Sequence, residues 1–439
     1  MSSVVAKLLC AGAMGAILFL SACVTKVPAD PARLASHGEA LAPIEWPELF
    51  GKDPVLPPPD ERGLTPVILL AHGLNGSSLS RVAFHTKAEV LASREAPYGK
   101  LVALRVVRSP DWEAEPDKRT LPVLQRLQYL AKGPTLREGM KEVQEGRTDA
   151  ITLTKEQEAW GDVPAESVLF DVREASPFAP QGPRGIILWF HSLGGLSFEE
   201  AAIAEMQRRG WHVAVSTFPW GMQADLNLML LEGTVDSMGR IAAGSVDRRM
   251  AMGAYAAEAV VNYMQSCAPE LAEKPIVVWG ASAGSFVAPA VAARLGERVK
   301  AMILVGSGAN LMEVSQKSTF FDGGVRLQYL PTEKKRTKDE EEARLTALKA
   351  EFLGEYAKAT KLDSLAVGPH LRTIPTLMLH GVADEIVPAK EGDELWRLLG
   401  KPERWEFSLG HQALFWRLSS QSRALADWLD ATLPARPVQ

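Results

Sequence analysis

From about residue 166 to the C-terminus, continuous apolar runs alternate with stretches of helical period, and this alternation constrains the fold more than any other feature of the sequence. The run Gly-Ile-Ile-Leu-Trp-Phe at residues 185–190 has no polar alternation, as expected of a strand that is covered on both faces. We expect further strands at residues 167–172, 212–217, 275–279, 301–305, 376–379 and 405–408.

Helical segments separate these strands. Ser197-Phe198-Glu199-Glu200 matches a capping box, which predicts a helix that ends near Gly210. Residues 246–265 and 286–295 are the other expected helices of the repeating pattern. Strands that alternate with helices predict an α/β fold, with a mostly parallel central sheet and helices on both of its faces.

The pentapeptide Gly280-Ala281-Ser282-Ala283-Gly284 lies between the expected strand 275–279 and the expected helix 286–295. In that context G-x-S-x-G indicates a sharp strand-to-helix turn that presents a nucleophilic serine. Side chains two positions on either side of Ser282 would clash in such a turn, which accounts for the two glycines. A tight turn of small residues without chemistry is the alternative.

A serine nucleophile needs a general base, and the base needs a carboxylate that orients it. His411 follows the last expected strand, and Asp384 follows the strand before it. Glu385 is the neighbouring alternative for the acid. Ligands of open α/β sheets bind at the carboxyl ends of the strands, so we expect Ser282, Asp384 and His411 to meet there.

With these residues the chain resembles the α/β-hydrolase fold over about residues 166–439. Residues 375–388 are especially similar to the acid region of monoacylglycerol-lipase-like and serine-aminopeptidase-like members. The resemblance implies that Ser282 attacks a carbonyl, that His411 shuttles the proton, and that Asp384 holds the imidazole tautomer.

The resemblance also implies an oxyanion hole built from two backbone N–H groups. Ala283 should supply one of them, because it directly follows the nucleophile. The other should come from the loop His191-Ser192-Leu193-Gly194-Gly195, where we expect Leu193 to be the donor. The sequence has Ser192 where the family has glycine, so Ser192 is an alternative donor, by its backbone or its hydroxyl.

His72-Gly73-Leu74-Asn75-Gly76 is, by its letters, a closer match to the family's oxyanion loop. Only one strand–helix unit is expected between this loop and the nucleophile, however, and the 210 positions from His72 to Ser282 (282 − 72) are too many for it. We therefore expect residues 61–165 to form an N-terminal extension with added strands, for example at residues 65–73 and 101–107. The alternatives are that residues 70–77 line the site, or that they belong to a partly duplicated hydrolase-like unit.

Two further segments flank the expected site. Residues 313–372 lie between two expected core strands, where this family often inserts a lid, and the charged residues 331–361 predict one helical stretch. That stretch is either a small helical lid or a solvated helix at the rim. Residues 219–244 are rich in apolar side chains, which form either a wall for an acyl or aromatic group or an ordinary part of the core.

The N-terminus has the features of a targeting segment. Lys7 precedes 13 almost wholly apolar residues (8–20), a length of about 20 Å as a helix, which is shorter than the ~30 Å hydrocarbon core of a bilayer. This favours a signal peptide over a membrane span. Leu20-Ser21-Ala22-Cys23 resembles the lipobox of bacterial lipoproteins, which implies a signal peptide at residues 1–22 and lipidation of Cys23. An ordinary secretory signal or an uncleaved apolar segment is the alternative.

Residues 23–60 hold eight of the 29 prolines, which predicts a semi-rigid tether. An irregular arm packed on the domain is the alternative from Trp46 onward. Val24, rather than an aspartate, follows Cys23, and this favours an anchor at the periplasmic face of the outer membrane or at the cell surface over the inner membrane.

Composition excludes several other classes. The formal net charge of −5 argues against nucleic-acid binding, and three cysteines exclude a disulfide scaffold. The sequence contains no H-E-x-x-H, C-x-x-C or Walker motif, so we expect neither a metal nor an organic cofactor.

The sequence therefore predicts a lipid-anchored serine hydrolase of the bacterial cell envelope, which cleaves a small-molecule carboxylic ester through an acyl-Ser282 intermediate. A peptidase or amidase of the same fold is one alternative. The other is a non-catalytic envelope lipoprotein.

Overall fold

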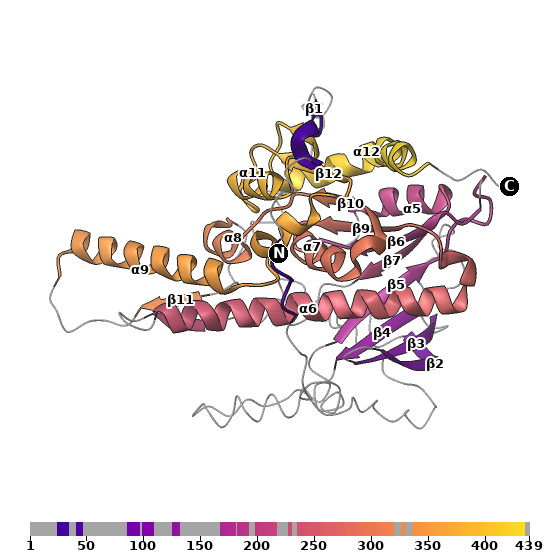
Figure 1. Ribbon diagram of the computed structural model, residues 1–439, viewed down its shortest axis with the longest axis horizontal. Helices are drawn as coiled ribbons and strands as arrows, with labels where there is room; N and C mark the ends of the chain where they lie inside the picture. The colour runs from indigo at the N-terminus through magenta and orange to yellow at the C-terminus, as the bar shows by residue number, and fades with distance from the viewer. Residues whose placement is uncertain are drawn as a thin grey trace, which may run out of the picture.

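The computed structural model describes residues 24–34, 41–46, 86–96, 99–108, 125–131, 167–180, 182–192, 198–216, 227–230, 235–319, 326–329 and 336–434. Within these residues an 11-stranded sheet runs in the order β1-β13-β12-β10-β9-β6-β7-β5-β4-β3-β2 (Figure 1). Its strands are β1 (Val24–Val27), β2 (Thr86–Ala96), β3 (Gly99–Arg108), β4 (Gln125–Ala131), β5 (Ser167–Arg173), β6 (Gly185–Phe190), β7 (Trp211–Ser216), β9 (Ile276–Ala281), β10 (Val299–Val305), β12 (Thr376–Gly381) and β13 (Glu403–Phe407).

The centre of the sheet is parallel. Strands β7, β6, β9, β10, β12 and β13 pair with their neighbours in parallel, and β5 and β1 join this set antiparallel. All six residues of β6, of β9 and of β12 are buried, because helices cover both faces of the sheet. A sheet with a parallel centre between two helical layers confirms the predicted α/β-hydrolase fold class.

The two helical layers form separate hydrophobic clusters with the sheet. Helices α5 (Glu200–Arg208) and α12 (His411–Thr432) pack on one face, and α6 (Val235–Cys267) and α7 (Gly284–Leu295) pack on the other. The remaining helices are α8 (Leu311–Lys317), α9 (Lys338–Ala359), α10 (Ser364–Val367) and α11 (Ala389–Leu398), with short 3-10 helices at Pro31–Leu34, Pro269–Leu271, Gly296–Arg298 and Gly368–Leu371. Among the described helices, none combines the length and the apolar character that a membrane span requires.

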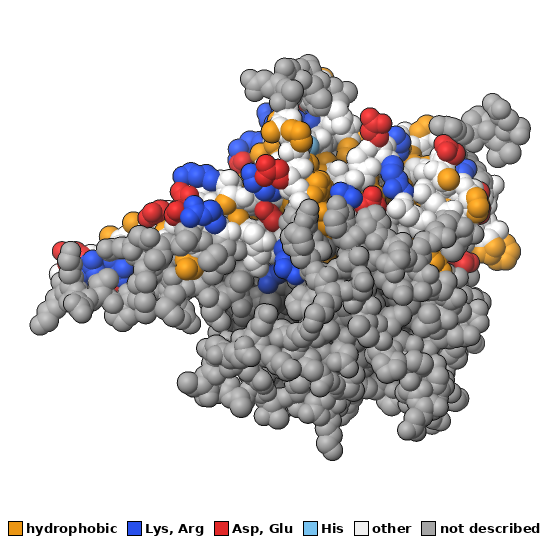
Figure 2. Space-filling view, turned by 60° about the horizontal axis from the view of Figure 1, so that its bottom comes forward, with side chains coloured by type: hydrophobic (Ala, Val, Ile, Leu, Met, Phe, Trp, Pro, Cys, Tyr) orange, Lys and Arg blue, Asp and Glu red, His pale blue; other side chains and the backbone are white. Residues whose placement is uncertain are grey.

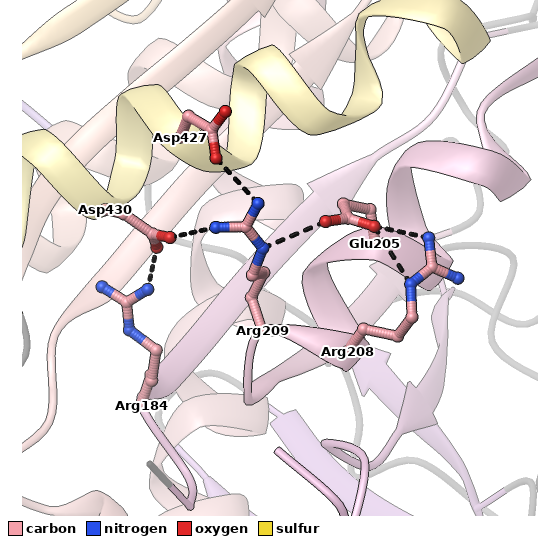
Figure 3. Close-up of polar contacts among 6 residues, drawn as sticks. All are labelled: Arg184, Glu205, Arg208, Arg209, Asp427 and Asp430. Atoms are coloured by element: carbon pink, nitrogen blue, oxygen red, sulfur yellow. Dashed lines mark hydrogen bonds and ion pairs between the residues drawn. The ribbon is translucent and has the colours of Figure 1, made fainter. Parts of the chain in front are cut away.

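A network of ion pairs fixes the C-terminal part of α12 (Figure 3). Arg209, directly after α5, pairs with Glu205 of α5 and with Asp427 and Asp430 of α12. Asp430 also pairs with Arg184, just before β6. The network ties α12 to α5 and to the start of β6, and α12 begins with His411.

The N-terminal extension continues the main sheet. Strands β2, β3 and β4 form an antiparallel series, and β4 pairs with β5. The boundary we expected at residue 166 therefore does not coincide with a break in the sheet. Strand β3 includes the expected strand 101–107, whereas the expected strand 65–73 and His72 lie outside the described residues.

Helix α6 begins at Val235, well before the expected start at residue 246. Its first turns are packed against residues 313–372, which we call the insertion. A Cβ added at Gly239 of α6 would lie only 2.7 Å from the Glu355 side chain of α9. The insertion thus provides the partner that stabilises the earlier start. A second parallel pair, β8 (Asn227–Leu230) with β11 (Arg326–Tyr329), joins the segment before α6 to the insertion.

The charged stretch of the insertion forms α9, which opens with a capping box between Thr337 and Glu340. Leu348, Phe352 and Tyr356 are buried and belong to the hydrophobic cluster that contains α6. On its outer side α9, which projects at the left of Figure 1, carries acidic and basic side chains interspersed (Figure 2). The helix is therefore a packed element with one solvated face.

The segment expected to be a tether contributes to the domain at two places. Val24–Val27 form β1, which pairs antiparallel with β13 at the edge of the sheet. Trp46 packs against Tyr255 of α6, with ring centroids 5.9 Å apart, and Arg294 of α7 lies over the Trp46 ring. Residues 24–27 and Trp46 are thus packed against the domain instead of spacing it from an anchor.

Candidate active site

Ser282 occupies the turn between β9 and α7, with a backbone φ of 50°. This positive φ is a strained conformation for a residue with a side chain. The turn is held by the Ser282 N–H, which donates to the Val305 carbonyl at 2.8 Å. The strained turn that the sequence predicted is therefore present.

The two glycines of the pentapeptide are required by close approach. A Cβ at Gly284 would lie 2.1 Å from the Phe190 carbonyl oxygen of β6. A Cβ at Gly280 would lie 2.6 Å from the Ser285 Cα and from the Ala288 Cβ of α7. The helix can follow the strand this tightly only because both positions lack a side chain.

His411 lies between Ser282 and Asp384, and hydrogen bonds join all three side chains. Its Nε2 lies 2.8 Å from Ser282 Oγ, and its Nδ1 lies 2.6 Å from Asp384 Oδ2. All three residues are buried. With Nδ1–H donating to the carboxylate, Nε2 is left free to accept the Ser282 proton.

Packing fixes the imidazole from two further sides. The ring of Phe415, one turn along α12, lies 5.0 Å from the His411 ring. Gly306, directly after β10, lies against the same ring, and a Cβ there would be 3.0 Å from His411 Cε1. Gly306 also has a φ of 56°, so both its backbone conformation and its surroundings favour glycine.

Asp384, rather than Glu385, is the acid that contacts the histidine. Asp384 Oδ1 accepts the backbone N–H groups of Ile386 and Val387 at 3.0 and 2.9 Å, which leaves Oδ2 for His411. Glu385 is exposed, and its backbone carbonyl accepts a hydrogen bond from Thr319. Among the described contacts of His411 the acid is therefore Asp384, and not the alternative Glu385.

The expected oxyanion donors are only partly described. Ala283 is the N-cap of α7, so its N–H is not committed to the helix's own hydrogen bonds. Leu193 lies outside the described residues. The Ser192 backbone N–H donates to Glu199 Oε1 at 2.9 Å, so the backbone form of the Ser192 alternative does not fit this geometry.

Glu199 is a fully buried carboxylate that lies inside the predicted capping box, whose capping pair would be Ser197 and Glu200. Helix α5 has no side-chain cap, because the Glu199 carboxylate turns inward and accepts hydrogen bonds from Trp189 Nε1 and the Ser192 N–H. Trp189 in turn stacks on Trp279, with ring centroids 3.9 Å apart. Burial raises the pKa of Glu199 to about 7, although its hydrogen bonds oppose the shift.

Glu199 therefore ties the start of the expected oxyanion loop to the core. The sequence did contain a signal for this contact, since a buried strand is followed by Ser192 and, seven residues later, by an acid. The choice between a helix cap and an inward-facing carboxylate required knowledge of where the Trp189 indole points.

A cavity of about 430 Å³ opens beside His411. Its described lining comes from the turn after β12, from the start of α12 and from the insertion: Thr319, Ala383, Glu385, Ile386, Gly410, His411, Gln412, Ala413 and Trp416. The cavity gives a small molecule access to the imidazole edge of the site. The described residues contain no group of three His, Cys, Asp or Glu side chains placed to hold a metal ion.

No protein-family model and no curated protein sequence matches the chain. Its fold is similar to several solved structures at low identity. Est1E from Butyrivibrio proteoclasticus shares 14% identity, with a TM-score of 0.37, 61% of this chain covered and 95% of the other. The esterase domain of a Rhodothermus marinus protein shares 15%, with a TM-score of 0.37 and coverages of 61% and 93%. A cold-adapted esterase from an Arctic intertidal metagenomic library shares 12%, with a TM-score of 0.34 and coverages of 78% and 97%.

Proposed function

We propose that this protein is a serine hydrolase that cleaves a carboxylic ester through an acyl-Ser282 intermediate. The observation that carries the proposal is the unbroken hydrogen-bonded chain from Ser282 through His411 to Asp384. A buried base that lies between a strained serine and a doubly hydrogen-bonded carboxylate is the arrangement that nucleophilic catalysis requires.

In the proposed reaction the Ser282 oxygen attacks the ester carbonyl while His411 Nε2 takes the serine proton. The positive charge that develops on the imidazole lies against the Asp384 carboxylate. The Ala283 N–H, at the N-terminus of α7, faces the oxyanion, and the helix dipole favours negative charge at that end. His411 then protonates the departing alcohol. It next deprotonates the water that attacks the acyl group, and it returns this proton to the Ser282 oxygen as the acid leaves.

A peptidase or amidase of the same fold is the second candidate, and Glu385 is the observation that favours it. Glu385 is the one carboxylate among the described residues that line the cavity, and its side chain is exposed. Such a group is suited to pair with the free amine of an aminoacyl substrate. An ester and an amide of the same amino acid, compared with Glu385→Gln, distinguish the two candidates.

We further propose that Cys23 carries a lipid anchor in a bacterial cell envelope. The support is the sequence Leu20-Ser21-Ala22-Cys23 at the end of an apolar segment too short to span a bilayer. Metabolic labelling with an alkyne fatty acid tests this proposal, with Cys23→Ala as the control. Equal labelling of both chains would refute it.

The reaction is tested first by fluorophosphonate labelling of the full chain, with the modified residue located by peptide mass spectrometry. The probe reports an activated serine and requires no knowledge of the substrate. We expect labelling at Ser282, and none in Ser282→Ala. If a folded full chain is not labelled, the non-catalytic lipoprotein is the better description.

A further inference from the structure

Strand β1 places Val24 at the carboxyl ends of the parallel strands, which is the side of the sheet where the candidate active site lies. Val24 pairs with Phe407, the last residue of β13, and the antiparallel strand β1 runs from there toward the opposite end. Phe407 also pairs with Gly381, the last residue of β12. Val24 therefore lies at the carboxyl ends of the strands, where Asp384 and His411 follow β12 and β13. Figure 1 shows β1, in indigo, beside these C-terminal elements at the top of the view.

The distances involved are short. Cross-strand partners have Cα atoms about 5 Å apart, and the four residues from Phe407 to His411 span at most about 14 Å. The Cα of Val24 thus lies within about 19 Å of the His411 Cα. Cys23 is bonded directly to Val24, and Val24–Val27 are paired in register with β13. A lipid on Cys23 would therefore have no spacer between itself and this edge of the sheet.

Exposed apolar side chains lie at the same edge. Trp416 lines the cavity beside His411 and is 38% exposed, and Val382, which precedes the cavity residue Ala383, is 48% exposed. Phe198 is 37% exposed, and its carbonyl accepts a hydrogen bond from Ser419, one turn of α12 beyond Trp416. We call these three side chains the apolar rim.

A fourth exposed aromatic residue provides the contrast. Phe178 is 90% exposed, and its neighbour Ala179 lies against Gly210, which directly precedes β7. Phe178 therefore lies at the amino ends of the parallel strands, away from the cavity and from Val24. An exposed aromatic side chain at that end serves as a matched control.

We propose that the apolar rim rests on the bilayer to which Cys23 is anchored, and that the site takes its ester from this bilayer instead of from the aqueous phase. The inference rests on the proposed ester hydrolysis and on the proposed lipid anchor. It adds the orientation of the domain and the phase that supplies the substrate. Amphipathic rings such as the Trp416 indole are enriched at bilayer interfaces, which is consistent with this seating.

The orientation is tested without reference to activity. The full lipidated chain, carrying Cys267→Ser, is labelled with a fluorophore at Val382→Cys or at Phe178→Cys. It is then placed in phosphatidylcholine vesicles that contain a nitroxide lipid. We expect the Val382→Cys label to lose at least half of its fluorescence, and the Phe178→Cys label to lose almost none. Equal quenching at the two positions would overturn the proposed seating.

The source of the substrate is tested with the double variant Phe198→Ser/Val382→Ser, which leaves the cavity lining unchanged. We expect hydrolysis of a water-soluble short-chain ester to stay within twofold, and hydrolysis of an ester lipid in phosphatidylcholine vesicles to fall at least fivefold. Phe178→Ser should change neither rate. Equal retention of both rates in the double variant would overturn the inference.

The two proposals fail in different ways. If the Val382→Cys label is quenched but the parent chain hydrolyses neither ester, the proposed reaction is wrong and the seating stands. If the parent chain hydrolyses only the soluble ester, the reaction stands and the bilayer is not the source of the substrate.

Discussion

Replacing Glu199 by glutamine tests whether this buried carboxylate holds the expected oxyanion loop in place. The substitution keeps the size of the side chain and turns one of its two oxygens into an NH₂ group. Because Trp189 Nε1 and the Ser192 N–H each donate to a separate oxygen, one of these donors then faces another donor. We expect the start of the loop to shift while the strand-to-helix turn at Ser282 is retained.

The expected size of the effect follows from the bond that is lost. A hydrogen bond to a charged acceptor contributes about 1.5–3 kcal/mol. If this free energy is lost from the stabilisation of the transition state, kcat falls by about 10–100-fold, since each 1.36 kcal/mol is a factor of ten. Removing an oxyanion donor outright costs about 10²–10³-fold, which sets the upper limit for an indirect effect.

The assay is steady-state hydrolysis of a soluble ester, with kcat and KM determined separately over pH. Displacement of the oxyanion donor should lower kcat and leave KM within about twofold, because the donor acts mainly in the transition state. Fluorophosphonate labelling of Glu199→Gln should slow by a similar factor. Glu200→Gln is the control, because Glu200 is exposed and pairs with Arg173. A folded Glu199→Gln enzyme with unchanged kcat would refute the positioning role.

Glu199 also predicts a pH dependence of stability. Burial raises the pKa of Glu199 from 4.5 in the unfolded chain to about 7, against hydrogen bonds from Ser192 and Trp189, with a small contribution from the neighbouring charge on Glu200. Between these two pH values the unfolded chain releases a proton that the folded chain keeps. The free energy of unfolding therefore falls as pH rises through this window, by about 3 kcal/mol in total. Denaturant titrations at several pH values should show a shallower decline for Glu199→Gln than for the parent.

Five further substitutions test the site and its support. Asp384→Asn should lower kcat by about 10⁴-fold with little change in stability, because it disturbs the His411 tautomer, whereas Glu385→Gln should leave ester hydrolysis nearly unchanged. If the effects are reversed, the acid is wrongly assigned. Gly284→Ala should destabilise the fold by more than about 3 kcal/mol in denaturant, since its Cβ meets the Phe190 backbone. Gly354→Ala in α9, where a Cβ meets nothing, should stabilise by up to about 1 kcal/mol. Asp363→Ala should also cost more than about 3 kcal/mol, because Asp363 accepts from the Asn310, Leu311 and Leu365 backbones and from the Tyr356 hydroxyl. A denaturation midpoint like that of the parent would contradict this.

The central strands were predictable because they are buried on both faces. The predicted strand 185–190 coincides with β6, and the predicted strand 376–379 lies within β12, since continuous apolar runs leave no choice of face. The strand-to-helix turn at Ser282 was predictable for a related reason. Two glycines around a serine between a strand and a helix specify a close approach, and a Cβ at either glycine would indeed collide with neighbouring atoms.

Elements that depend on distant partners were not predictable. Val24–Val27 form a four-residue edge strand whose two central residues are exposed, and its sequence is too short and too polar to suggest pairing with a strand near the other end of the chain. The early start of α6 at Val235 depends on α9, which follows it by about 100 residues in the sequence. In both cases the stabilising contact lies outside any local window.

The order of the strands explains why the site itself could be predicted from single positions. Ser282 and His411 are 129 positions apart, and His411 and Asp384 are 27 apart, yet each residue lies in the first turn after the carboxyl end of a strand. Strands β9, β10, β12 and β13 are consecutive parallel neighbours in the sheet, so these turns lie along one edge. Knowledge of which strand each residue follows is therefore sufficient to bring the three together. Glu199 precedes a helix instead, and its inward orientation is determined by the Trp189 indole and the Ser192 N–H, which strand order does not specify.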